Sequence, residues 1–378
     1  MSTKKGPGFQ KTWGTFSAGG GRGCGRRKIT GPREPNTPLL RLNGMNTLYN
    51  GMTIDLDTPL IHQKQRTPDR SYHQVSLRRY LRTEHCLQPW QVQNNARYHP
   101  RNLSYHAPAA VRAIAHAVEQ RGCIIAGFSA LALYGLPYLV EGADTTLVTT
   151  SGHTSLGGPC RPTIRRSRTL LAIWTVTHRG VSLQAVTPLT AVIQALVQVK
   201  RGEHRWNTIT VEGLAPEEIR GIQLVDCVRR FWDITPSSIA KAARHKIDAA
   251  WLHKVLLHSS ALADSPKETE MRLLVAALAD RHGCTVEEQV PLRVGGQLVT
   301  VFDLAIPELK IAVMYDGAHH SDYQQRNKDS SITLKMIAQG WTPARCSAAT
   351  MFECLDLIEK LMREGRGAAQ AEKVPNGF

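Results

Sequence analysis

The 378-residue sequence lacks several features that would place it in familiar classes. None of its eight cysteines forms a C-x-x-C pair, which argues against a zinc ribbon and against a secreted disulfide framework. No apolar run approaches the roughly 18 residues that a membrane span needs, and the N-terminus has no apolar signal core. No segment repeats. We therefore expect a soluble protein of a reducing, cytoplasmic compartment, without a membrane partner.

Acidic residues are scarce in the first part of the chain. Residues 1–105 carry 17 Lys/Arg and 5 Asp/Glu, a net charge of +12, whereas residues 264–378 carry 13 and 16, a net charge of −3. The whole chain has a net charge of +16 and a pI near 9.7. Such an excess is typical of proteins that bind a polyanion, most often nucleic acid, although a basic surface can also serve solubility. The sequence thus predicts DNA as a partner, gripped by one part while another part does chemistry.

The N-terminal third divides into two segments. Residues 1–40 are rich in Gly, Lys, Arg and Pro, which predicts a disordered basic arm that follows a nucleic-acid backbone or is a dispensable tail. Residues 41–105 are compatible with a winged helix, with helices over Val75–His85 and Pro89–Arg97 and an extended Leu103–His106. Any polar helical pair would look similar. The basic residues predicted to contact DNA in this segment are Arg78, Arg79, Arg82, Arg97 and Arg101.

Residues 106–263 predict a mixed α/β domain. Helical spacing begins at Ala107–Gln120, and Ile124–Tyr134 is a second helix-compatible segment. The expected strands are Thr145–Thr149, Thr163–Arg166 and Leu170–Thr177. The expected helices after them are Thr187–Val199, Gly221–Trp232, Thr235–Arg244 and Asp248–His258.

Residues 264–365 predict a C-terminal domain of order α-β-β-β-α-β-α. Ser265-Pro266-Lys267-Glu268 is a capping box that starts its first helix. Gly295-Gly296 is typical of a hairpin between the first two strands. The remaining residues, 366–378, are expected to form a disordered tail. The fold class is therefore α/β, in a multidomain α+β arrangement.

Two strands of this domain end in acidic residues. Asp303 closes the strand Gln297–Leu304, and Asp316 follows the strand Lys310–Tyr315. Carboxylates at the ends of adjacent strands can approach each other, and such a pair favours a divalent cation with a preference for oxygen ligands. The alternative is that Asp303 caps a turn and Asp316-Gly317 makes the next one.

These residues carry a resemblance. The C-terminal domain contains, in this order, Ser265-Pro266-x-Glu268, Asp303-Leu304-Ala305-x-Pro307, Tyr315-Asp316-Gly317-x-x-His320, Gly340-Trp341 and Arg345. With these motifs it resembles bacterial proteins related to the very-short-patch-repair endonucleases. That family belongs to the PD-(D/E)xK superfamily, whose core has the same αβββαβ order. The upstream segment, with Ser129-Ala130, Tyr134-Gly135-Leu136-Pro137 and Val186-Thr187-Pro188, is similar to AbiEi-type antitoxins of type IV toxin–antitoxin systems.

The resemblance implies Mg²⁺- or Mn²⁺-dependent hydrolysis of DNA phosphodiesters. Asp303 and Asp316 would hold the metal, and Glu268 would hold a metal-bound water or tune the site. His320 would act as a general base or as the acid for the leaving group, and Arg345 would meet the phosphate and so contact DNA. Each has a structural alternative: a capping role for Glu268, a turn for His320, an ion pair for Arg345.

One position departs from the family pattern. Met314 stands where the family usually has Glu, and Met is a poor ligand for Mg²⁺. Either the site is active, as in the very-short-patch-repair enzymes that also lack this acid, or it has decayed. The first case predicts an endonuclease of restriction, repair or defence, with a methyltransferase as a candidate partner. The second predicts a non-catalytic, AbiEi-type transcriptional regulator with a toxin partner. A third reading is a nuclease toxin that a partner holds in check.

Overall fold

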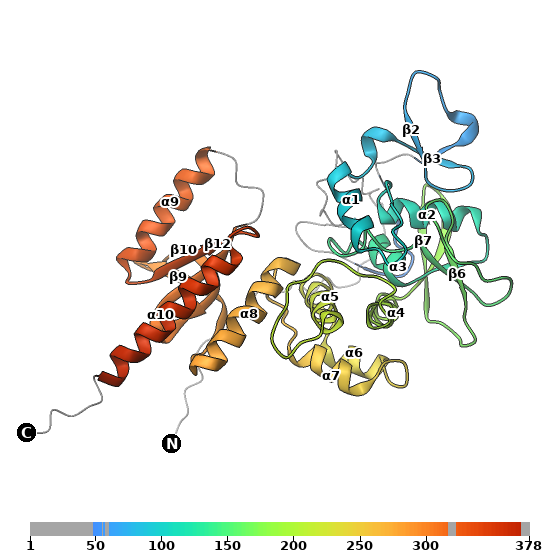
Figure 1. Ribbon diagram of the computed structural model, residues 1–378. Helices are drawn as coiled ribbons and strands as arrows, with labels where there is room; N and C mark the ends of the chain where they lie inside the picture. Colours follow the sequence, from blue (N-terminus) through green and yellow to red (C-terminus); the bar gives the residue numbers. More distant parts are fainter. Residues whose placement is uncertain (1–47, 55, 57–59, 317–322, 372–378) are drawn as a thin grey trace, which may run out of the picture.

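A computed structural model of the chain describes residues 48–54, 56, 60–316 and 323–371. The strands in this part form three sheets, and helices pack around them (Figure 1). The mixed α/β class predicted from the sequence is confirmed. Within the described residues, no helix combines the length and the apolar character that crossing a bilayer requires.

The first described segment folds differently from the prediction. Its strands are β1 (Ile61–His62), β2 (Tyr72–Gln74) and β3 (Arg79–Arg82), in the sheet order β1-β3-β2. The helix predicted over Val75–His85 is wrong, because the chain turns at Ser76 and returns as β3. Glu119 fixes this turn: one of its oxygens accepts from Ser76 Oγ at 2.8 Å and from the Arg78 backbone N–H at 2.9 Å.

One α-helix, α1 (Pro89–Tyr98), lies between residues 60 and 105, and it confirms the second predicted helix. The other helical turns described there are 3₁₀ turns, η1 (Gln63–Gln65) and η2 (Thr83–His85). The helix pair expected for a winged helix-turn-helix is therefore not found in this part of the described chain. Instead, Met52, Ile54 and Leu81 join the large apolar core of the following residues.

That core surrounds a five-stranded mixed sheet. Its order is β6-β5-β4-β8-β7, and β4 runs parallel to β8 while β5 runs parallel to β6. The strands are β4 (Ile124–Ile125), β5 (Thr146–Thr149), β6 (Thr163–Arg166), β7 (Ile173–His178) and β8 (Val181–Val186). The helices are α2 (Ala109–Glu119), α3 (Gly127–Leu133), α4 (Pro188–Lys200), α5 (Pro216–Trp232), α6 (Pro236–Ala242) and α7 (Ala249–Leu257).

The C-terminal unit has the predicted order α-β-β-β-α-β-α. Its elements are α8 (Pro266–His282), β9 (Glu287–Val294), β10 (Gln297–Ile306), β11 (Ile311–Tyr315), α9 (Tyr323–Ala338), β12 (Thr342–Cys346) and α10 (Met351–Ala371), with the 3₁₀ turn η3 (Pro307–Leu309) between β10 and β11. The sheet order is β12-β11-β10-β9, antiparallel except that β11 and β12 are parallel. The predicted hairpin turn is confirmed: Gly295 and Gly296 have φ of 58° and 81°, as a primed turn requires.

Helices cover both faces of this sheet (Figure 1). Leu304 and Val313 pack with Met271 of α8 and Ile358 of α10 in one apolar cluster. Phe302 packs on the other face in a second cluster, which includes Met336 of α9 and Trp341. Each strand thus buries side chains in both directions, which explains its nearly continuous apolar sequence.

The predicted disordered tail begins too early, because α10 continues to Ala371. Gly365 lets this part of the helix pack closely on η3, because a Cβ at this position would lie 2.5 Å from Cδ2 of Leu309. The Ala-Ala-Gln-Ala sequence at 368–371 is made of good helix formers. The predicted arm, residues 1–40, lies outside the described residues.

Candidate functional site

Glu268 lies in the first turn of α8, where Ser265 is the N-cap as predicted; the reciprocal bond of a capping box, from the Ser265 backbone N–H to the Glu268 carboxylate, is replaced by one from Asp264. Ser265 Oγ accepts a hydrogen bond from the Glu268 backbone N–H at 3.2 Å and donates one to Oε1 of the Glu268 side chain at 3.0 Å. The other carboxylate oxygen, Oε2, accepts from the Asp264 backbone N–H at 2.8 Å. Burial, with the negative charge of nearby Asp303 as a further cause, raises the pKa of Glu268 to about 7.

Asp303 lies on β10, close to its C-terminal end. Its Oδ2 accepts a hydrogen bond of 2.6 Å from the Tyr315 backbone N–H on β11, which fixes the side chain against the neighbouring strand. Burial raises the pKa of Asp303 to about 6, and the charges of Asp264 and Asp316 act in the same direction. The acid is therefore held in an environment that disfavours its ionised form.

The side chains of Glu268 and Asp303 meet at one small cavity between α8 and the sheet. The cavity has a volume of about 10 Å³, room for about one water-sized sphere. Two carboxyl groups from different elements therefore approach each other at a site with space for one small ligand. Its lining is completed by Leu262, Ala263, Met271, Arg272, Glu288, Gln289 and Leu304.

Asp316 is engaged in a different interaction. Arg345 on β12 donates from Nε to Oδ2 at 3.0 Å and from Nη2 to Oδ1 at 2.7 Å, so both oxygens of Asp316 are used by one guanidinium. A third acid, Asp329 on α9, lies 3.7 Å from Arg345 Nη2. The hydrogen bonds to Asp316 raise the pKa of Arg345 further. The structure thus places Arg345 in contact with Asp316, one of the two acids predicted to hold the metal.

Met314 lies on the other side of the sheet. Its side chain packs on the cluster that contains Phe302, Ala312 and Met336, whereas the neighbouring Tyr315 packs on the α8 side. Side chains along a strand alternate between its faces, so this arrangement follows from the register of β11. In this structure Met314 contributes to an apolar core and not to the cavity of Glu268 and Asp303.

Arg272 is a residue of the cavity that the sequence analysis missed. Its Nη2 donates to Oδ2 of Asp226 on α5 at 2.7 Å, and its Nε lies 3.6 Å from Oε2 of Glu288. Asp226 is 1% exposed and also accepts from Thr269 Oγ1 at 2.9 Å. Arg272 follows Glu268 by four residues and so shares its helix face, a signal that was available in the sequence.

The arginines predicted to bind DNA fall into two groups. Arg101 faces inward, because it forms an ion pair with Asp144 and donates to the Gly157 carbonyl at 2.6 Å. Arg82 is partly buried and pairs with Glu84 at 3.3 Å. The other three are at the surface or partly so: Arg78, Arg79 and Arg97.

His320 lies outside the described residues. Within the described part of the chain, no group of three or more His, Cys, Asp and Glu side chains is arranged to hold a metal ion. The donor chemistry at the cavity nevertheless fits a hard cation in type, since Glu268 and Asp303 both offer carboxylate oxygens and Oδ1 of Asp303 has no described hydrogen bond. Asp316 fits less well, since Arg345 uses both its oxygens.

Comparison of the chain with known proteins adds no relative to this description: no family model, no curated protein and no solved structure matches it.

Proposed function

We propose that this chain is a DNA-binding protein whose C-terminal unit hydrolyses DNA phosphodiester bonds with the help of Mg²⁺ or Mn²⁺. The observation that carries the proposal is the pair Glu268 and Asp303, which α8 and β10 bring to one cavity with raised pKa values. Raised pKa values that arise from burial and from neighbouring acids are typical of functional sites. The αβββαβ order of the unit, which agrees with the PD-(D/E)xK core, supports the same reaction.

In this proposal Asp303 is the principal metal ligand. A divalent cation bound there would polarise a phosphate oxygen and lower the pKa of a bound water. Its charge would also offset the repulsion that now disfavours ionisation of Asp303 and Glu268. Glu268 is the second carboxylate that lines the same cavity, and its hydrogen bonds to the turn at 264–265 hold it in a fixed orientation.

Asp316 and Arg345 act as a pair. Asp316 can join the site as a ligand when its hydrogen bonds to Arg345 open, and the released guanidinium then has a phosphate oxygen as its natural partner. His320 keeps the proposed role of a general base or acid, because imidazole titrates near neutral pH.

A second candidate function is a non-catalytic DNA-binding regulator of the AbiEi type. Two observations favour it: Met314 packs in an apolar core, and Arg345 neutralises Asp316 in a bidentate ion pair. Both features are expected in a nuclease fold that has lost its activity and is retained as a scaffold. In that case the cavity acids would have no catalytic task.

The two candidates differ in one assay. Purified protein is incubated with supercoiled plasmid and Mg²⁺ or Mn²⁺, beside Asp303→Asn and the exposed-acid control Asp280→Asn on the same helix–sheet unit. The nuclease nicks the plasmid, the control nicks it equally, and Asp303→Asn does not. Retained DNA binding with no nicking by any of the three proteins would favour the regulator.

A further inference from the structure

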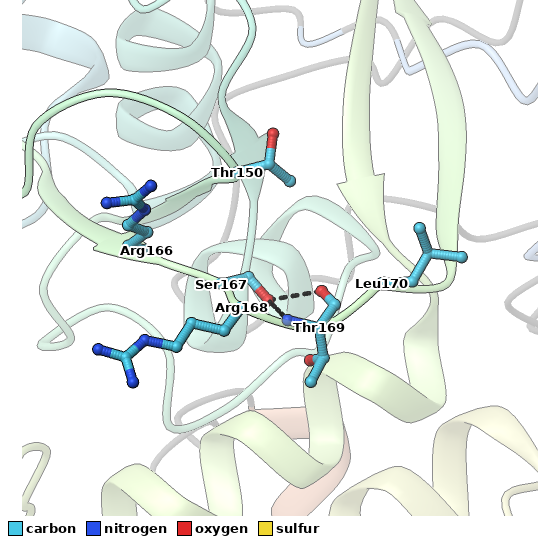
Figure 2. Close-up of a pocket in the computed structure, with 6 residues that line it drawn as sticks. All are labelled: Thr150, Arg166, Ser167, Arg168, Thr169 and Leu170. Atoms are coloured by element: carbon cyan, nitrogen blue, oxygen red, sulfur yellow. Dashed lines mark hydrogen bonds between the residues drawn. The ribbon is translucent and has the colours of Figure 1, made fainter.

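A hollow of about 540 Å³ lies at the edge of the five-stranded sheet, far along the chain from the carboxyl cavity. It is formed where the edge strand β6 runs into the loop toward β7. Its lining contains two arginines, three hydroxyl side chains, one leucine and no acid. These residues are Thr150, Arg166, Ser167, Arg168, Thr169 and Leu170 (Figure 2).

The arginines of this segment differ in whether an acid pairs with them. Arg165 donates from Nη2 to Glu203 at 2.6 Å. Arg166 and Arg168 are exposed, and neither guanidinium has an ion-pair or hydrogen-bond partner in the part of the chain that the structure describes. Figure 2 shows the Arg166 guanidinium above the backbone ribbon and the Arg168 guanidinium below it, both in the left half of the view. Two unpaired cations therefore face solvent beside one hollow.

The backbone fixes this loop against the sheet. The Ser167 N–H donates to the Thr149 carbonyl at 2.9 Å, and Ser167 Oγ donates to the Thr169 carbonyl at 2.8 Å. A fixed loop loses little conformational freedom when it binds a ligand, which favours affinity. The arginines are thus presented from a preformed surface.

The sequence around the hollow has an unusual charge pattern. No acidic residue occurs between Asp144 and Glu203, whereas this interval contains seven Lys/Arg. A surface with unpaired arginines and few acids creates a positive potential that attracts polyanions. Among polyanions, a nucleic-acid backbone suits a concave site, because a phosphate ridge can enter the hollow. A flat lipid surface would meet mainly its rim.

We infer that Arg166 and Arg168 of the β6–β7 loop form a contact site for the phosphodiester backbone of DNA. This inference rests on the proposed function for the identity of the partner, but it concerns binding and not hydrolysis. It locates a phosphate contact on the five-stranded sheet, beyond the arginines predicted between residues 78 and 101. The hydroxyls of Thr150 and Thr169 would add hydrogen bonds to phosphate oxygens.

The test measures the salt dependence of binding to a fluorescent 30-base-pair duplex with the full-length protein. The test variant is Arg166→Gln/Arg168→Gln. Each lost phosphate contact lowers the slope of log affinity against log salt by about 0.9, so the double variant should lose about 1.8. The parent-to-variant affinity ratio should then fall about tenfold between 50 and 200 mM salt.

Three comparisons make the result specific. Arg166→Lys/Arg168→Lys keeps both charges and should keep the slope. Lys335→Gln/Arg363→Gln removes two exposed charges from α9 and α10 and should also keep it. Unfolding midpoints within a degree or two of the parent would show that the variants remain folded, as is usual for exposed positions.

An unchanged slope in the Gln double variant would overturn the inference. So would binding of the parent to phosphatidylserine vesicles but not to the duplex, which would assign the patch to a lipid surface. The plasmid assay separates this inference from the proposed function. A reduced slope without nicking supports the DNA contact and rejects hydrolysis, whereas nicking with an unchanged slope does the reverse.

Discussion

Asp303→Asn should make the protein more stable at alkaline pH while it removes the proposed activity. Asparagine has nearly the shape of aspartate, and its Oδ1 can still accept the hydrogen bond from the Tyr315 N–H. The substitution therefore removes mainly the negative charge at the cavity. A residue kept for chemistry at a cost in stability should show this behaviour.

The magnitude follows from the pKa of Asp303, which is about 6 in the folded chain against an ordinary value of 3.8. The carboxyl binds its proton more tightly when folded, so its favourable contribution is complete below pH 3.8 and is lost as the pH rises through about 6. A difference of about 2 pKa units corresponds to about 3 kcal/mol. The variant's advantage should therefore grow from about 0.5 kcal/mol at pH 4, through about 1.5 at pH 5, to about 3 at pH 8.

Urea denaturation of both proteins at these three pH values measures the advantage directly. Asp316→Asn serves as the matched control, because it breaks the ion pair with Arg345 and should lower the stability instead. A variant that is no more stable than the parent at pH 8 would refute the reasoning. An advantage of the same size at every pH would refute it as well, since the effect would then not come from ionisation.

Three further outcomes are expected. Mn²⁺ at pH 8 should raise the unfolding midpoint of the parent but not that of Asp303→Asn, because a ligand that binds only the folded state stabilises it. Equal increases in the unfolding midpoints of both proteins would show that the ion binds elsewhere. Arg345→Gln should lower the free energy of unfolding, measured by urea denaturation, by about 1 kcal/mol. It should also tighten Mn²⁺ binding in titration calorimetry, because both oxygens of Asp316 become free. Weaker Mn²⁺ binding would exclude Asp316 as a ligand. Asp226→Asn should cost about 3 kcal/mol by the same denaturation, because the largely buried Arg272 loses its closest acid and keeps only Glu288, at 3.6 Å; a loss below 1 kcal/mol would contradict this.

Much of the C-terminal unit could be predicted from local sequence signals. The Ser265 N-cap with Pro266 after it, the Gly295-Gly296 turn and the β-branched runs each determine one element with little help from the rest of the chain. Because these signals follow one another closely, the order of the elements and most of their ends agree with the structure. The choice of Asp303 required only the position of one acid at the end of an apolar strand.

The rest depends on contacts between distant residues. The turn at Ser76 is held by Glu119, 43 residues away, so local helical spacing over Val75–His85 was misleading. Strand β8, which has six residues like β7, was missed because it follows β7 after only Arg179-Gly180, and the positive φ of Arg179 in this turn is not evident from the local sequence. Local pattern also cannot show that Arg345 occupies Asp316 or that Arg101 faces Asp144, since each depends on the tertiary arrangement.

The most direct test of the account is nicking of supercoiled plasmid by the purified parent and Asp303→Asn, with Mg²⁺ or Mn²⁺, at pH 8. The parent is expected to convert supercoiled to open-circular plasmid, and EDTA is expected to stop the conversion by chelating the metal. The variant is expected to bind the plasmid without nicking it. Plasmid left intact by a parent protein that still binds DNA would contradict the account, and it would identify the C-terminal unit as a scaffold.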